Sequence, residues 1–169
     1  MTGLLGADKS NWMPRQVLFL CSGNYYRSRF AEHLFNWLAQ QSALAWQADS
    51  RGLLVGQFGN IGPISRHAVR ALKSRGIPID GWHRNPQPVT AEDLANANIV
   101  VAVKESEHRP VIDALFPEWA DRVEYWTVDD LDCATPEEAL PQLEQEVQAL
   151  IHRLRVDRSS SPSRSRSVG

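Results

Sequence analysis

The stretch VLFLCSGNYYRSRFAEHLF, residues 17–35, joins three local patterns and decides the fold. Its first four residues form a continuous apolar run, which is typical of a strand buried on both faces. A loop containing Gly23 follows, and from Ser28 to Gln41 apolar residues recur at helical spacing. The stretch therefore predicts a strand at 17–20, a loop, and a helix at 28–41.

The same alternation continues along the chain. We expect three more strands at 45–49, 98–103 and 122–128, and helices at 64–75, from the capping-box sequence 90–93, and at 105–115. A last helix carries a long apolar stripe and begins either at residues 135–138 or at Pro141. This pattern predicts a three-layer α/β/α fold with a four-stranded parallel sheet and helices on both faces. In such sheets ligands bind beyond the carboxyl ends of the strands.

The composition excludes several classes of protein. The chain has 169 residues, a formal net charge of −2 and two cysteines, too few for a disulfide scaffold or a cysteine-ligated zinc site. A net charge near zero gives no electrostatic surface for nucleic acid, and no apolar run is long enough to span a membrane. The histidines lack the spacing of metal ligands. We therefore expect a cytoplasmic protein with no metal site.

The two ends of the chain differ from the part between them. Residues 1–13 show no period and are expected to form a flexible leader. Residues 157–169 are rich in Ser and Arg and nearly free of apolar side chains, so they cannot offset the entropy of ordering. We expect a disordered tail there and a folded domain at 14–156.

The loop between the first strand and the first helix, residues 21–28, is suited to binding an anion. Its backbone N–H groups can curl inward and continue into the helix N-terminus, where the helix dipole favours negative charge. The same field favours the thiolate form of Cys21, a potential nucleophile. Arg27 can hold two oxygens of a phosphoryl group, and Ser28 can donate its hydroxyl to the thiolate. This combination favours phosphoryl chemistry over a structural cysteine.

The loop reads Cys-x-Gly-Asn-x-x-Arg-Ser, and over about residues 15–155 the chain resembles the low-molecular-weight protein tyrosine phosphatases. The resemblance includes a turn at residues 49–52 after the second strand. It implies hydrolysis of phosphotyrosine through a phosphocysteine intermediate, with no cofactor, and hydrogen bonds of Asn24 and Ser50 within the loop. The candidate substrate-binding residues are Ser22, Gly23, Asn24, Tyr25, Tyr26, Ser28 and Ser50.

A general acid is expected in the loop after the last strand. The resembled family has an Asp-Pro pair there, and Asp130 occupies the position of that Asp, with Leu131 in place of the Pro. Because of this departure, Asp129 remains an alternative to Asp130 as the acid. The aromatic residues that follow Asp-Pro in the family are also absent here, so we expect Tyr25 and Tyr26 to form the wall of the site.

Two other functions remain as alternatives to a phosphatase. An arsenate reductase on this fold relays oxidation through two further cysteines after the third strand, and residues 104–110 contain none. A catalytically impaired phosphate-binding module is supported only by the missing Pro. The partners expected for the phosphatase are phosphotyrosine proteins, such as a bacterial-type tyrosine kinase, with no nucleic acid and no membrane. The protein itself is expected to be a monomer or weak dimer.

Overall fold

Four parallel strands form the centre of the structure in the order β2-β1-β3-β4. The computed structural model describes residues 13–79 and 83–160. Strand β1 pairs in parallel with β2 and β3, and β3 pairs in parallel with β4. The strands are β1 (Arg15–Cys21), β2 (Trp46–Gly52), β3 (Ile99–Ala102) and β4 (Glu124–Tyr125). The predicted four-stranded parallel sheet is confirmed.

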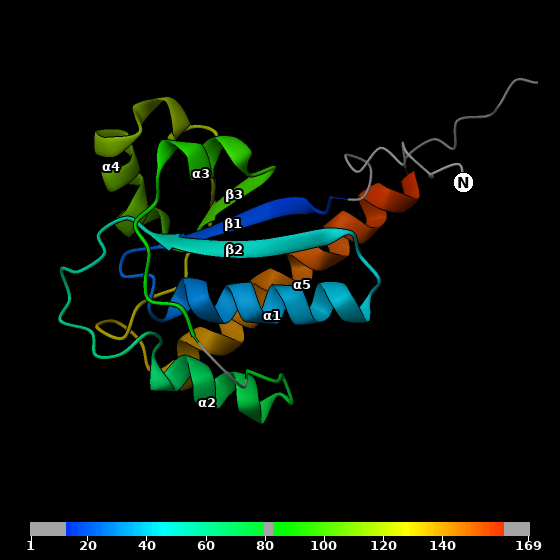
Figure 1. The fold of residues 1–169 in the computed structure, drawn as a ribbon, viewed down its shortest axis with the longest axis horizontal. Helices are drawn as coiled ribbons and strands as arrows, with labels where there is room; N and C mark the ends of the chain where they lie inside the picture. The colour runs from blue at the N-terminus through cyan, green and yellow to red at the C-terminus, as the bar shows by residue number, and fades with distance from the viewer. Residues whose placement is uncertain (1–12, 80–82, 161–169) are drawn as a thin grey trace, which may run out of the picture.

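Helices cover both faces of this sheet (Figure 1). Helices α1 (Arg27–Gln41), α2 (Arg66–Ser74) and α5 (Pro136–Ser160) pack on one face. Helices α3 (Ala91–Asn96) and α4 (Glu105–Leu115), with the 3₁₀ turn η2 (Pro117–Trp119), pack on the other. The three-layer α/β/α arrangement predicted from the sequence is therefore confirmed. None of the helices in the described residues combines the length and apolar composition that crossing a lipid bilayer requires.

Strand β1 lies between two hydrophobic cores because its side chains alternate between the two faces. Val17 and Phe19 pack against the layer of α1, α2 and α5, and both are fully buried. Leu18 and Leu20 pack into the layer of α3 and α4. Burial on both faces explains why the sequence of this strand is continuously apolar.

Strand β1 lies at a reversal in the sheet, because the connection after β1 leads to β2 on one side and the connection after β3 leads to β4 on the other side. In an open parallel sheet, the crevice at the carboxyl end of such a strand is the usual place for a ligand. Cys21 is the last residue of β1 and lies beside the end of β3. The topology therefore places the loop that follows Cys21 at the mouth of this crevice.

Strands β1 and β3 end within two residues of their predicted bounds, whereas β2 and β4 each differ by three residues at one end. Strand β2 continues to Gly52, because its register with β1 is unbroken as far as the Cys21–Gly52 pair, so Asp49 and Ser50 lie in the strand and not in a turn after it. Strand β4 is shorter than the predicted 122–128 and covers only two residues. The apolar alternation in this segment arises because Val123, Trp126 and Val128 are buried. Only Glu124 and Tyr125 pair with β3 as strand residues.

The helices agree more closely with the sequence patterns. Helix α4 has the predicted bounds 105–115. The capping box before α3 is present: the Thr90 hydroxyl accepts from the N–H of Asp93, whose carboxylate accepts from the N–H of Thr90. Helix α5 begins at Pro136, and Pro141 lies inside it. The buried stripe of α5 against α1 outweighs the single hydrogen bond that Pro141 removes.

The predicted ends of the domain are only partly within the described residues. Helix α5 continues to Ser160, so residues 157–160 of the expected tail are helical. Residues 161–169 of the expected tail and residues 1–12 of the expected leader lie outside the described residues.

Gly52 ends β2 at a point of close backbone approach. A Cβ atom there would lie 2.5 Å from Cγ2 of Val55, 2.8 Å from the carbonyl oxygen of Ser22 and 3.0 Å from Cβ of Asn24. Contacts this short force neighbouring atoms to move. Glycine therefore lets the end of β2 lie directly against the loop after β1. Two hydrogen bonds join these segments, from the N–H groups of Leu53 and Leu54 to the carbonyls of Cys21 and Ser22.

Replacing Gly52 with alanine is expected to lower the free energy of unfolding by about 1–3 kcal/mol, because the methyl group overpacks this contact. Chemical denaturation of the wild type and of Gly52→Ala measures the loss. A second substitution, Val55→Ala in the Gly52→Ala background, removes the shortest contact and should recover part of the stability. An equally stable Gly52→Ala protein would contradict this account.

Candidate active site

The phosphate loop, residues 21–28, turns the chain from β1 into α1. Asn24 has φ +51°, a left-handed conformation that few residues other than glycine adopt without support. The loop closes into α1 at Arg27, the first residue of the helix, and the carbonyl of Tyr26 accepts from the N–H of Phe30. The positive end of the helix dipole is therefore directed at the loop.

Three carbonyl groups of this loop face outward, toward neighbouring backbone. Those of Cys21 and Ser22 accept from the segment after β2, and that of Tyr25 accepts from the N–H of Ser65 at 2.8 Å. A trans peptide carries its N–H opposite to its C=O. The N–H groups of Ser22, Gly23 and Tyr26 therefore point into the loop, in the arrangement of backbone donors that binds anions.

The sulfur of Cys21 has a hydroxyl partner whose proton is free to reach it. Cys21 Sγ lies 2.9 Å from Ser28 Oγ, and Asn24 Nδ2 donates to that same Oγ at 2.9 Å. Because Ser28 Oγ accepts from the Asn24 amide, its own proton is available for Cys21 Sγ. Cys21 is only 3% exposed, so this contact is shielded from water. The Ser28 hydroxyl can therefore donate a hydrogen bond to the sulfur.

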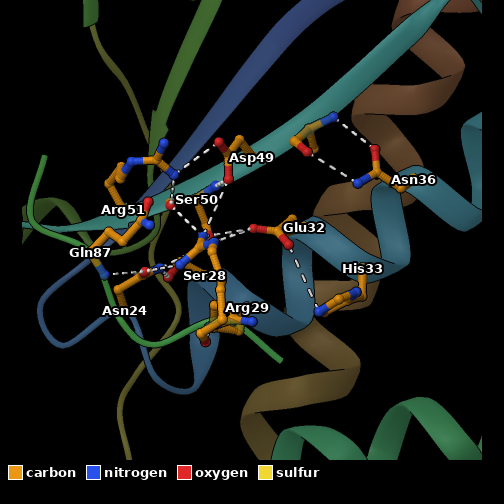
Figure 2. A network of polar contacts seen from close by, with 12 residues as sticks. Asn24, Ser28, Arg29, Glu32, His33, Asn36, Asp49, Ser50, Arg51 and Gln87 are labelled. Carbon is orange, nitrogen blue, oxygen red and sulfur yellow. Dashed lines mark hydrogen bonds and ion pairs between the residues drawn. The ribbon is translucent and has the colours of Figure 1, made fainter. Parts of the chain in front are cut away.

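The Asn24 side chain is fully hydrogen-bonded (Figure 2). Its amide N–H groups donate to Ser28 Oγ and to Ser50 Oγ, both at 2.9 Å. Its Oδ1 accepts from Arg84 Nη1 at 2.9 Å and from the N–H of Gln87 at 3.0 Å. These four bonds hold the left-handed residue, and they come from α1, β2 and the segment before α3.

Arg84 links the elements around Asn24. Besides Asn24, its guanidinium donates to the carbonyl and hydroxyl oxygens of Ser50 and lies 3.1 Å from Glu32 and 3.2 Å from Asp49. The backbone carbonyl of Arg84 accepts from Arg29 Nη1 at 2.9 Å, so α1 holds this segment in place. One side chain thus connects the phosphate loop, α1 and the end of β2.

Glu32 is the most buried acid of this network. Its Oε1 accepts from Ser50 Oγ at 2.6 Å and pairs with Arg84, and its side chain is 12% exposed. Burial raises the pKa of Glu32, although the hydrogen bond from Ser50 and the charge of Arg84 oppose the shift. The carboxylate of Glu32 therefore depends on Arg84 for its stability.

Arg27 is buried to 1% exposure and reaches across the end of the sheet. Its Nη1 donates to the carbonyl of Val128 at 2.9 Å, and its Nη2 lies 2.6 Å from Glu107 Oε2 and 3.4 Å from Asp130 Oδ2. Burial disfavours its charge, but Cys21, Asp130 and Glu107 outweigh burial and raise the pKa of Arg27 further. It is a permanent cation at the inner end of the site.

The two candidate acids of the loop after β4 have different partners. Asp129 Oδ1 pairs with Lys104 Nζ at 2.7 Å, so it is tied to the end of β3. Asp130 instead faces Arg27, and its backbone carbonyl accepts from the N–H groups of Cys133 and Ala134, which turns the chain toward α5. Asp130 is therefore the acid that lies beside Arg27.

A cavity of about 200 Å³ joins these groups. Buried Cys21 and Arg27 line it together with exposed residues, so it leads inward from the surface to the sulfur. Its lining residues are Cys21, Gly23, Tyr25, Tyr26, Arg27, Phe58, Asn60, Asp130, Leu131 and Asp132. Within residues 13–79 and 83–160, no group of His, Cys, Asp or Glu side chains could hold a metal ion.

The structure separates the predicted site residues into two groups. Those that line the cavity are Cys21, Gly23, Tyr25, Tyr26, Arg27 and Asp130. The side chains of Ser22, Asn24, Ser28 and Ser50 are buried beside it and bond to protein groups instead. Their position makes them supports of the loop.

The two loop tyrosines differ in position. Tyr25 is half-buried, and its hydroxyl donates to the carbonyl of Ile61 at 2.6 Å, which fixes its ring beside the cavity. Tyr26 is buried in the core, with its ring 6.4 Å from that of His67. Burial and the nearby charge of Asp130 raise the pKa of Tyr26 to about 12, so its hydroxyl stays protonated.

Several residues of the site carry no motif that sequence reasoning could use. Glu107 lies in the stretch after the third strand, which the topology indicates as a ligand-binding position. Arg84 and Glu32 are brought to the loop by contacts between residues distant in the chain. Phe58 and Asn60 belong to the glycine-containing segment after β2, whose exposed side chains give no helical or strand period.

Comparisons with known proteins agree with this site. The sequence profile of the low molecular weight phosphotyrosine protein phosphatases matches residues 16–160. A protein-arginine-phosphatase of Bacillus subtilis (strain 168) is 29% identical over 154 residues, which are 84% of this chain and 98% of that protein. The human low molecular weight phosphotyrosine protein phosphatase is 31% identical over 97 residues, covering 56% of this chain and 58% of that one.

A solved structure shows the same architecture along the whole domain. The low molecular weight protein tyrosine phosphatase from T. tengcongensis superposes with a TM-score of 0.67 and 28% identity, covering 85% of this chain and 99% of that one. The protein is therefore a cysteine-based phosphatase by fold and by sequence. It belongs to the low molecular weight phosphotyrosine protein phosphatase family.

Replacing Arg84 with glutamine is expected to cost about 3 kcal/mol of stability near neutral pH, because it leaves the Glu32 carboxylate buried without its cation. The pKa of Glu32 already lies above its usual value, and the variant raises it further. An acid with a raised folded-state pKa stabilises the fold at low pH, and this stabilisation is lost as pH rises through that pKa. The deficit of Arg84→Gln should therefore grow between about pH 5 and about pH 8.

Thermal unfolding midpoints of the wild type and of Arg84→Gln across this pH range measure the effect. The matched control is Arg70→Gln, which removes the same charge from an exposed position on α2. It should unfold like the wild type at every pH. A deficit of Arg84→Gln that does not change with pH would argue against a buried Glu32–Arg84 pair.

Proposed function

We propose that this protein hydrolyses aryl phosphate monoesters, above all phosphotyrosine in proteins, through a phosphocysteine intermediate on Cys21. The observation that carries the proposal is the cavity in which Cys21, Arg27 and Asp130 meet. A nucleophile, a phosphate-binding cation and a proton donor at one site are the groups that such a reaction needs.

In the first step the Cys21 thiolate attacks phosphorus, and the bond from phosphorus to the tyrosine oxygen breaks. Arg27 and the inward-facing N–H groups of the loop bind the non-bridging oxygens, where negative charge is held in the transition state. Asp130 gives its proton to the departing oxygen, so tyrosine leaves neutral. The products are the S-phosphocysteine and the free tyrosine side chain.

In the second step water attacks the phosphocysteine. Asp130, now a carboxylate, accepts a proton from the water, and the S–P bond breaks to release inorganic phosphate. The Ser28 hydroxyl, 2.9 Å from Cys21 Sγ, stabilises the thiolate that leaves. The site then returns to its starting state without a metal or an organic cofactor.

Asp130 is the better candidate for the acid than Asp129. It lines the cavity and lies 3.4 Å from Arg27, whereas Asp129 is outside the cavity lining and pairs with Lys104. The loop reaches this position with Leu131 in place of the Pro of the resembled family. The Lys104–Asp129 pair and the turn closed by Cys133 and Ala134 support it instead.

The apolar residues that line the cavity are suited to a substrate with an aromatic leaving group. The Tyr25 ring, Phe58 and Leu131 are apolar surfaces around the path to Cys21. Such surfaces favour a flat phenyl ring. Because Cys21 is only 3% exposed, a substrate must also project its phosphate inward on a long side chain.

Phosphoarginine is a second candidate substrate. The observation that favours it is a second carboxylate, Asp132, which lines the cavity with Asp130 and can pair with a guanidinium group. The Bacillus subtilis relative that matches most of this chain is a protein-arginine-phosphatase. Arsenate reduction has less support, because the chain offers Cys133 as its one other cysteine.

The proposed physiological setting follows from the chemistry. Cys21 must remain a free thiol, which reducing compartments maintain, and both cysteines are free in the structure. We therefore place the reaction in the cytoplasm, on phosphoproteins such as a bacterial-type tyrosine kinase. The protein would act as a monomer or weak dimer.

Replacing Asp130 with asparagine is expected to lower kcat by about 10²–10⁴-fold, because both proton transfers lose their group. Replacing Cys21 with serine should abolish turnover. Steady-state hydrolysis of an aryl phosphate in the presence of a chelator measures both. The matched control, Asp129→Asn, removes the neighbouring carboxylate and should have a much smaller effect. A larger loss of kcat in Asp129→Asn than in Asp130→Asn would assign the acid to Asp129. Full activity of Cys21→Ser would exclude the mechanism.

Peptides of one sequence carrying either phosphotyrosine or phosphoarginine distinguish the two substrates. We expect a higher kcat/KM for the phosphotyrosyl peptide. If Asp132 pairs with a guanidinium, Asp132→Asn lowers kcat/KM for phosphoarginine and leaves that for phosphotyrosine unchanged. A wild-type preference for phosphoarginine that Asp132→Asn removes would reverse the assignment.

A further inference from the structure

The carboxylate of Glu107 makes the shortest polar contact of Arg27. Glu107 lies in the first turn of α4, and its Oε2 is 2.6 Å from Arg27 Nη2. It is outside the cavity lining, so it acts on a substrate only through Arg27. Burial opposes its ionisation, but the hydrogen bond from His108 and the charge of Arg27 lower the pKa of Glu107 to about 2.

A buried histidine holds this carboxylate in place. The backbone N–H of Lys104 donates to His108 Nδ1 at 3.1 Å, so the neutral ring carries its proton on Nε2. His108 Nε2 lies 3.1 Å from both Glu107 Oε2 and Ser22 Oγ. His108 is fully buried, and burial lowers its pKa, which keeps the ring neutral. The position of Glu107 is thus tied to the phosphate loop.

Glu107 and Asp130 compete for the same nitrogen of Arg27. Nη2 is 2.6 Å from Glu107 and 3.4 Å from Asp130, while Nη1 is occupied by the carbonyl of Val128. A guanidinium released from Glu107 has Asp130 as its nearest remaining carboxylate. A close pair with Arg27 would use the oxygens of Asp130 and turn its carboxyl group away from the leaving group.

We propose that Glu107 is a positioning residue that holds Nη2 of Arg27 apart from Asp130 and so keeps Asp130 free to donate its proton. The inference rests on the proposed function. It gives each of three charged groups a separate role: Glu107 fixes the guanidinium, Arg27 binds the phosphoryl oxygens and Asp130 exchanges the proton.

The test compares two substrates that differ in their need for an acid. Phenyl phosphate releases a strongly basic phenolate that needs protonation, whereas 4-nitrophenyl phosphate releases a stable anion that does not. In Glu107→Gln, kcat/KM for phenyl phosphate should fall by about tenfold or more, as expected when an acid is impaired. The value for 4-nitrophenyl phosphate should fall much less. A merely structural role would lower both values by the same factor.

A matched control lies two residues earlier on the same helix. Glu105 is exposed and pairs with Arg109 instead of Arg27, so Glu105→Gln removes the same charge from the same turn of α4. It should leave both kcat/KM values unchanged. Glu107→Asp keeps the charge but shortens the side chain, and its leaving-group ratio should fall between those of the wild type and Glu107→Gln.

The Asp130→Asn background tests whether Glu107 acts through the acid. Without an acid to protect, Glu107→Gln should not change the ratio between the two substrates any further. Thermal unfolding of each variant shows whether it is folded, and Glu107→Asp carries the comparison if Glu107→Gln does not fold. An unchanged ratio in a folded Glu107 variant overturns the inference. A wild-type protein that hydrolyses neither substrate overturns the proposed function instead.

Discussion

Four hydrogen bonds to the Asn24 side chain hold the phosphate loop in its shape. The loop needs a left-handed residue at this position to turn from β1 into α1, and a non-glycine residue is strained there unless its surroundings fix it. The side-chain N–H groups of Asn24 donate to Ser28 and Ser50, and its oxygen accepts from Arg84 and Gln87. These bonds fix the residue in its left-handed conformation. Since Ser28 also contacts Cys21, the geometry of the sulfur and the turn of the backbone depend on the same side chain.

Charge in the site is arranged in two layers. Beside Asn24, the cation Arg84 is paired with Glu32 and Asp49, and it supports the loop without lining the cavity. At the cavity itself, Arg27 is shared between Glu107 and Asp130. The layer beside Asn24 stabilises the shape of the loop, and its Arg84–Glu32 pair, with side chains 17% and 12% exposed, is buried enough that losing one partner is costly. The inner layer leaves one cation available for an incoming anion.

Local patterns in the sequence were sufficient for β1, α1, α4 and the loop that joins the first two, because apolar periodicity, a glycine and the Cys–Arg spacing are all local signals. They predicted β4 as a strand but overestimated its length, because burial of Trp126 and Val128 extends the strand-like alternation beyond the two residues that pair with β3. The roles of Arg84 and Glu107 could not be predicted, since each depends on contacts with residues 60 or 80 positions away. The sequence placed Asp130 in the position of the family's Asp but left Asp129 as an alternative, and their partners in space distinguish the two.

The segment that forms the outer wall of the cavity is attached to the phosphate loop at few points. It contains glycines with positive φ at 56, 59 and 62, and the Tyr25 hydroxyl holds it through the carbonyl of Ile61. A backbone carbonyl is the same whatever side chain stands at that position. Side chains such as Phe58 can therefore be exchanged without disturbing Asn24, Arg27 or their partners. In this architecture, recognition of the substrate and the chemistry at sulfur can diverge independently during evolution.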